Sequence, residues 1–298
     1  MGERVMWFDG TCVPWEEARV HVWDELALRG ANVFEGMTAF WDEGAQEHRL
    51  LAGEQHVDRL FGSARIADIP TRYDRDEVFA ALSEVAARHP GVDVYLRPTF
   101  YAARGRSSLA PESVGAMYIG GFEFRPVAPP AVRAAVSSHS RYGGPIGPLA
   151  KSGGSYLDFR VFERERLTHG VEHIIILNER GHVAEADGAA VLLVRDRTVL
   201  VPPVSAGVLD SITKRILLDI ARGLGYTVTE RAVLREELYG AQVVLAGTLL
   251  GVRLVDSVDG VTPHQARDTS CAQELADAYE GLCRGEHPLS KAFLQPLT

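Results

Sequence analysis

One stretch of the chain guides the interpretation of the rest: Pro148-Leu149-Ala150-Lys151-Ser152-Gly153-Gly154-Ser155-Tyr156. Its small residues leave room for a ligand to approach the main chain closely. The amine of Lys151 becomes a nucleophile only when partial burial lowers its pKa. A flexible surface loop with a solvated lysine is the alternative, and the loop alone does not separate the two interpretations.

Lysine is rare in this chain, which draws attention to Lys151. Of the 31 residues that are lysine or arginine, only Lys151, Lys214 and Lys291 are lysines. Arginine therefore supplies nearly all the positive charge, whereas only lysine has an amine that can lose its proton and attack a carbonyl carbon. An ordinary solvated side chain remains the alternative for each of the three.

The composition is that of a globular protein. The chain has 298 residues, of which 46% are hydrophobic and 24% charged, and its formal net charge is −9. These values exclude a disordered or fibrous chain, and the acidic balance argues against nucleic acid as a partner. No apolar run is long enough for a membrane span or a signal peptide, so we expect a cytoplasmic protein. Three irregularly spaced cysteines predict neither a disulfide framework nor a metal site.

A proline-rich stretch predicts two domains. Residues 126–131 would link a small N-terminal α/β domain, residues 1–125, to a larger domain, residues 132–298. In the small domain the apolar spacing predicts helices at 54–66 and 76–88 and strands at 5–8, 36–41, 92–101 and 116–124. In the large domain it predicts helices at 156–169 and 211–224 and strands at 132–138, 174–177, 183–194 and 243–246.

Two threonines lie where a phosphate could bind. Thr213 lies in the first turn of the helix predicted at 211–224, where free N–H groups and the helix dipole favour an anion. Ordinary capping by Asp210 or Ser211 explains the same pattern. Thr248 offers a second hydroxyl after an apolar strand, although Gly247-Thr248 by itself is a weak motif.

Two charged residues also have a functional and an ordinary interpretation. Glu185 lies among small residues before an apolar strand, so its carboxylate would suit a cationic ring nitrogen, or would simply face solvent. Arg59 lies beside the apolar face of its helix and either reaches a phosphate or is solvated.

Two matches to serine-hydrolase motifs are misleading. Ser211-Ile212-Thr213-Lys214 fits S-x-x-K, but Lys151-Ser152-Gly153, which fits K-[ST]-G, precedes it, the reverse of the order in penicillin-recognising enzymes. Gly153 to Leu157 lacks the last glycine of G-x-S-x-G. We also find no Walker A loop, no strand-coupled GxGxxG and no HExxH.

Taken in order, these weak motifs resemble one family, the fold-type IV enzymes that use pyridoxal 5′-phosphate (PLP), and among them the branched-chain aminotransferases. The similarity runs from Trp7 to Gly260. The matching segments are Asn32–Gly36 (S-V-F-E-G), Glu54–Leu60 (E-H-x-x-R-L), Tyr95–Pro98 (Y-I-R-P), Ala150–Tyr156 (A-K-x-G-G-N-Y), Ser211–Thr213 (G-I-T), Arg235–Tyr239 (R-E-E-L-Y) and Gly247-Thr248 (G-T).

The resemblance implies a two-domain α+β fold, with a mixed, β-barrel-like C-terminal domain that also carries helices, and a role for each candidate residue. Lys151 would bind PLP covalently and move a proton at the substrate α-carbon. Glu185 would pair with the pyridine nitrogen and Tyr156 with the phenolic oxygen of the ring. The phosphate would be held by Arg59, Ile212, Thr213 and Thr248.

The resemblance places Arg29, Phe34, Tyr95, Arg97 and Leu249 at the substrate, and Arg97 suits a second carboxylate such as that of glutamate. Arg29 stands where the family has a tyrosine and would act as a carboxylate clamp, in its own subunit or its neighbour's. The leucine pair at 249–250 replaces two small residues, and Gly188-Ala189-Ala190 replaces G-E-N. The cofactor residues are thus retained while the substrate residues differ.

We therefore expect a homodimeric PLP-dependent aminotransferase that moves an amino group between an amino acid and a 2-oxo acid such as 2-oxoglutarate. The branched-chain type is the leading hypothesis, and a D-amino acid or (R)-amine transaminase is the first alternative. An aminodeoxychorismate lyase, which releases pyruvate without an acceptor, is a further alternative. A relative without catalytic activity is disfavoured because Lys151 and Glu185 are both present.

Overall fold

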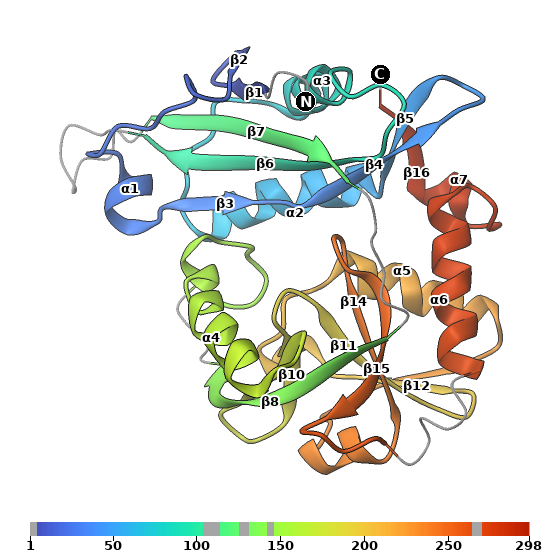
Figure 1. Ribbon diagram of the computed structural model, residues 1–298. Helices are drawn as coiled ribbons and strands as arrows, with labels where there is room; N and C mark the ends of the chain where they lie inside the picture. The colour runs from blue at the N-terminus through green and yellow to red at the C-terminus, as the bar shows by residue number, and fades with distance from the viewer. Residues whose placement is uncertain (1–4, 104–113, 125–130, 142–145, 264–269, 298) are drawn as a thin grey trace. The chain divides into compact units, whose positions relative to one another are not determined.

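The computed structural model describes residues 5–103, 114–124, 131–141, 146–263 and 270–297 (Figure 1). The chain divides into two compact units. The first consists of Met1–Arg125, Leu149–Tyr156 and Lys291–Thr298, and the second of Pro126–Pro148 and Leu157–Ser290. Among the described residues, no helix combines the length and the apolar character needed to cross a membrane.

Two short segments lie in the first unit although the sequence analysis placed them in the second domain. The segment with Lys151 joins the first unit because Ser152 bridges to Val33, and the C-terminal segment joins it because Leu294 to Pro296 pair with a strand there. Of the expected linker at 126–131, only Ala131 lies among the described residues, and it begins a strand. The boundary at 126–131 therefore stays a prediction.

The first unit is built on one eight-stranded sheet with the order β16-β5-β4-β6-β7-β1-β2, and β3 pairs with β6. Every strand pair in it is antiparallel. Its elements are β1 (Val5–Phe8), β2 (Thr11–Pro14), α1 (Glu25–Arg29), β3 (Asn32–Phe34), β4 (Met37–Asp42), β5 (Glu47–Leu51), α2 (Gly53–Ile66), α3 (Arg75–Ala86), β6 (Val94–Ala102), β7 (Gly115–Glu123) and β16 (Leu294–Pro296), with the short helix α7 (Ser290–Phe293) before β16.

Helices α2 and α3 pack their apolar faces into the core of the first unit. Val57, Leu60 and Ala64 recur at helical spacing on α2 and are buried with Leu82 of α3. Helix α3 begins with a capping box, in which the Asp74 carboxylate accepts the N–H of the third helical residue. The helices predicted at 54–66 and 76–88 are therefore present, with small shifts at their ends.

The second unit contains a mixed eight-stranded sheet with the order β10-β9-β8-β15-β14-β11-β12-β13. The pairs β8–β9, β8–β15 and β12–β13 are parallel, and the others are antiparallel. Its elements are β8 (Ala131–Arg141), α4 (Phe159–His169), β9 (His173–Asn178), β10 (Val183–Ala186), β11 (Ala190–Arg195), β12 (Thr198–Val201), α5 (Ile212–Gly223), β13 (Thr227–Glu230), β14 (Gln242–Gly247), β15 (Gly251–Val258) and α6 (Ser270–Cys283), with 3-10 turns at Val204–Ala206 and Arg235–Tyr239.

Two predicted elements of the large domain are wrong in detail. The strand expected at 183–194 is two strands, β10 and β11, because Gly188 takes a left-handed conformation with φ of 86° and the chain turns there. The helix expected from residue 156 begins at Phe159, and Tyr156 instead ends a short 3-10 turn that starts at Gly154.

The core of the first unit predicts the effect of truncating a buried side chain of α2. Leu60 has no exposed surface, so Leu60→Ala should lower the free energy of unfolding by about 2–5 kcal/mol. Ile66→Ala, on the same helix but 46% exposed, should cost about 1 kcal/mol or less. Urea denaturation of both variants measures the difference, and equal losses would contradict the packing described.

Candidate active site

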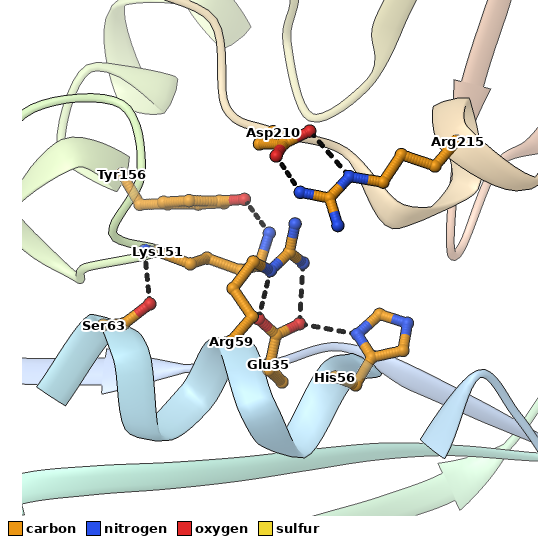
Figure 2. Close-up of polar contacts among 8 residues, drawn as sticks. All are labelled: Glu35, His56, Arg59, Ser63, Lys151, Tyr156, Asp210 and Arg215. Carbon is orange, nitrogen blue, oxygen red and sulfur yellow. Dashed lines mark hydrogen bonds and ion pairs between the residues drawn. The ribbon is translucent and has the colours of Figure 1, made fainter. Parts of the chain in front are cut away.

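The main chain of Lys151 is held on both sides within the first unit, and Figure 2 shows the bond to Ser63 on one of them. Its N–H donates to the Ser63 hydroxyl of α2 at 3.0 Å, and its carbonyl accepts from the Phe34 N–H of β3 at 3.0 Å. The side-chain amine donates to the Tyr156 hydroxyl at 2.5 Å. Lys151 is therefore half-buried and fixed. It is not the solvated lysine of a flexible loop, which was the alternative interpretation of the sequence.

Aromatic rings surround the amine of Lys151. The rings of Phe34 and Tyr156 meet edge to face at 4.7 Å, and the Lys151 nitrogen lies 5.2 Å and 4.9 Å from their centres. The guanidinium of Arg97 lies over the same Phe34 ring at 3.9 Å. The structure thus brings four predicted site residues into one cluster.

Arg59 is not on a solvated helix face. Its guanidinium donates to both carboxylate oxygens of Glu35, from Nε at 2.6 Å and from Nη2 at 2.8 Å. His56, one turn earlier on α2, contacts the same carboxylate through Nδ1 at 2.8 Å. Glu35 has no exposed surface, and Figure 2 shows its carboxylate between the two side chains of α2.

Burial and charge determine the protonation of this cluster. Burial by itself would raise the pKa of Glu35, but the charge and hydrogen bonds of Arg59, with the hydrogen bond of His56, outweigh burial and lower it to about 2. Burial also lowers the pKa of His56, so the imidazole is neutral near pH 7. The cluster is therefore an arginine–glutamate ion pair with a neutral histidine.

Two more predicted substrate residues lie in the first unit. Tyr95 is buried, and burial raises its pKa to about 12. Its hydroxyl packs so closely on Gly36 that a Cβ atom there would overlap it, which explains the glycine of the F-E-G motif. Arg29 ends α1 and forms an ion pair with Glu25, one turn earlier on that helix.

Glu185 lies on β10 in the second unit, and its carboxylate is held at both oxygens. Oε1 lies 3.1 Å from Nη2 of Arg141, and both side chains are only 14% exposed. Oε2 accepts the Leu209 N–H at 3.0 Å. Glu185 therefore does not occupy an ordinary solvent-facing strand position.

Helix α5 begins at Ile212, as the phosphate hypothesis requires. Ser211 is its N-cap, because the serine hydroxyl accepts the Lys214 N–H at 3.1 Å. Asp210 instead forms an ion pair with Arg215 (Figure 2). Ile212 and Thr213 are both 4% exposed.

Thr213 and Thr248 are placed differently in the second unit. Thr213 lies in the first turn of α5 and is buried. Thr248 is half-buried in the turn between β14 and β15, and Leu249 beside it is 48% exposed. Gly247 lies so close to the Gly188 carbonyl that a Cβ atom would come within 2.8 Å of it.

The sequence analysis missed four residues of these clusters. Glu35 and His56 lie inside motifs that were quoted for other residues, so their charge and spacing could have pointed to them. Ser63 follows Arg59 by one helical turn, which is a weaker clue. Arg141 lies at the end of β8, and no pattern in the sequence pairs it with Glu185.

Comparison with known proteins places the chain in a family. Residues 32–258 match the family model described as Amino-transferase class IV, which is more than half of the chain. The chain belongs to the class IV aminotransferases. The Escherichia coli K12 branched-chain-amino-acid aminotransferase is 29% identical to this aminotransferase over 94% of the chain and 93% of its own length.

Solved structures show the same fold. The branched-chain aminotransferase of Thermoproteus uzoniensis, crystallised with norvaline, matches with a TM-score of 0.92 and 29% identity over the full length of both chains. The PLP form of the Thermobaculum terrenum enzyme matches with a TM-score of 0.90 and 28% identity over 99% of both chains. The predicted fold class, a two-domain fold of type IV, is confirmed.

The Glu35 cluster predicts how stability depends on pH. With a pKa of about 2 in the folded protein and 4.5 as the ordinary value, Glu35 contributes stability that is fully present above pH 4.5. That contribution, about 3 kcal/mol, is lost as the pH falls toward 2. In Glu35→Gln this titration is absent and Arg59 loses its buried counter-ion.

The stability advantage of the wild-type protein over Glu35→Gln should therefore shrink between pH 5 and pH 2, by about 3 kcal/mol. Urea denaturation at a series of pH values measures this, with the exposed Glu43→Gln as the control variant. An advantage that stays constant over this range would show that Glu35 does not ionise as described.

Proposed function

We propose that this protein is a PLP-dependent aminotransferase of the branched-chain type, which moves an amino group between an amino acid and a 2-oxo acid such as 2-oxoglutarate. The observation that carries the proposal is the amine of Lys151, fixed through its own main chain and directed at the Tyr156 hydroxyl in a member of an aminotransferase family. The relatives with known names are branched-chain aminotransferases.

The residues present fit PLP. In the first unit, Lys151 would hold the cofactor covalently, Tyr156 would donate to its phenolic oxygen and Arg59 would bind its phosphate. Arg59 is already oriented by Glu35, so little ordering remains to be done when a phosphate binds. When bound, PLP supplies an electron sink for the pair of electrons left at the substrate α-carbon.

The second unit offers a carboxylate for the pyridine nitrogen of PLP and N–H donors for its phosphate. The Glu185 carboxylate, held by Arg141 and the Leu209 N–H, would keep a proton on the pyridine nitrogen. The N–H groups that begin α5 at Ile212 and Thr213, with the Thr248 hydroxyl, would bind phosphate. Lys151 would then take the proton from the substrate α-carbon and deliver it to the C4′ carbon of the cofactor.

Arg97, stacked on Phe34, is the residue proposed to bind the substrate. The guanidinium of Arg97 is exposed and stacked on a buried ring, which leaves its N–H edge for the second carboxylate of glutamate or 2-oxoglutarate. The exposed Leu249 supplies an apolar surface for a branched side chain.

Three further points remain proposals from the sequence. They are the homodimer, the cytoplasmic location, and the role of Arg29 and Tyr95 as substrate residues.

The role of Lys151 predicts a specific covalent adduct. Borohydride reduction of the protein with PLP should attach the cofactor to Lys151, and mass spectrometry of peptides locates it. Lys151→Ala should lose both the adduct and the visible absorption of lysine-bound PLP, whereas the exposed Lys291→Ala should keep both. An adduct that persists in Lys151→Ala would refute the proposed site.

The visible absorption of lysine-bound PLP also identifies the class of amino donor. L-leucine should abolish the visible band of the wild-type protein. A band abolished only by D-alanine, D-glutamate or (R)-1-phenylethylamine would instead support the D-amino acid or (R)-amine alternative. Pyruvate released from aminodeoxychorismate without an acceptor would support the lyase.

Arg97 should determine how well dicarboxylates are used. Arg97→Met removes the charge but keeps an unbranched side chain over Phe34, so kcat/KM for glutamate should fall about 10-fold or more, as expected for a lost charged hydrogen bond. For leucine kcat/KM should change about 2-fold or less. Steady-state kinetics with both donors checks this, and equal losses would assign Arg97 a structural role.

A further inference from the structure

Helix α2 carries three buried or nearly buried polar residues along one face. His56 and Arg59 both contact Glu35, and Ser63, with no exposed surface, accepts the Lys151 N–H. Arg59 and Ser63 are four residues apart, so their side chains lie on the same face, one turn from each other. Figure 2 shows Arg59 and Ser63 on α2 with Lys151 above them.

We propose that Ser63 is a positioning residue for Lys151, and that one turn of α2 sets the spacing between the amine and the guanidinium of Arg59. The rise between residues four apart in a helix is about 6 Å. The inference rests on the proposed function, in which Lys151 binds the cofactor and Arg59 its phosphate. It adds the element that keeps these two groups at a constant separation.

The loop around Lys151 is tied to two different elements. On its C-terminal side it is bound to β3, because the Lys151 carbonyl accepts the Phe34 N–H and the Gly153 N–H donates to the Asn32 carbonyl at 3.0 Å. Ser63 adds the tie to α2. Without that tie the loop would follow β3 alone, and its distance from Arg59 would no longer be fixed by a rigid helix.

The surroundings make the Ser63 hydroxyl hard to replace. Ala150 and Ser152, on both sides of Lys151, are each 3% exposed, and Ser63 is fully buried. Water therefore has little access to the Lys151 N–H, and a buried N–H without an acceptor is costly. The loop must shift to recover a partner when the hydroxyl is removed.

A fixed main chain matters for catalysis because the Lys151 amine, as the residue that would hold the cofactor, would be free after the first half-reaction and would have to bind again at the end of the second. While released, the Lys151 side chain is directed by its main chain and by the hydrogen bond to Tyr156. Ser63 therefore acts on the return and on proton transfer, more than on substrate binding.

The test compares Ser63→Ala with Ser83→Ala. Ser83 lies on α3 of the same unit and donates to the Leu297 carbonyl at 3.5 Å, so the control also removes one side-chain hydrogen bond to the main chain. In Ser63→Ala without cofactor, the Lys151 amide should exchange its hydrogen about 10-fold faster or more, measured by NMR. Ser83→Ala should leave this rate unchanged.

With PLP bound, two further readouts follow. The pH at which the visible absorption is half developed should shift in Ser63→Ala, and kcat should fall about 10-fold while KM changes about 2-fold or less. Ser63→Cys, which keeps the volume and a weak acceptor, should give intermediate values. In Ser83→Ala the pH midpoint, kcat and KM should match those of the wild-type protein.

Two outcomes would overturn the inference. The first is amide exchange at Lys151 in Ser63→Ala that equals the wild-type rate. The second is faster exchange with no change in the pH profile or in kcat, which would make Ser63 a structural residue only. An active Lys151→Ala would refute the proposed function by itself, so failure of the inference and failure of the function are distinguishable.

Discussion

The ion pair between Glu35 and Arg59 is the interaction on which the polar face of α2, formed by His56, Arg59 and Ser63, depends. A carboxylate without exposed surface is tolerated only when its charge is balanced and its oxygens accept hydrogen bonds. Arg59 supplies both through two parallel N–H bonds, and His56 adds a third contact. Because Glu35 follows β3 and Arg59 lies on α2, the pair joins strand and helix. The face of α2 that meets the Lys151 loop is thereby fixed.

Local patterns in the sequence predicted much of the first unit. The helices expected at 54–66 and 76–88 correspond to α2 and α3, since apolar spacing and an N-cap are properties of neighbouring residues. Gly188 divides the strand expected at 183–194, and the dipeptide Asp187-Gly188, which favours a turn, was the local signal for it. The pairing of β16 with β5 joins segments almost 250 residues apart in the chain, which no local pattern encodes. The short strands β3 and β13 were missed for the related reason that they pair with strands distant in the chain. Strand β2 was missed although its pairing with β1 is local.

The same division between local and long-range information holds for the candidate site. Lys151, Arg59, Glu185 and Thr213 were predicted because each lies in a short motif. Their partners could not be found this way, since Glu35 and Arg59 come from different elements, as do Arg141 and Glu185. Register explains the second pair: β8 and β10 both pair with β9, which places the end of β8 near Glu185. A motif points to a candidate residue, whereas the fold determines what holds that residue.

Arginine and lysine have different contacts in these clusters. Both carboxylates, Glu35 and Glu185, are paired with arginine, and Arg59 uses the planar fork of the guanidinium to bond both oxygens of Glu35. A lysine ammonium has no such fork. Among the residues that the structure describes, Lys151 forms no ion pair; its amine contacts a hydroxyl and two aromatic faces, which are neutral. The chain thus pairs these two carboxylates with arginine, whereas the lysine proposed to hold the cofactor has neutral partners.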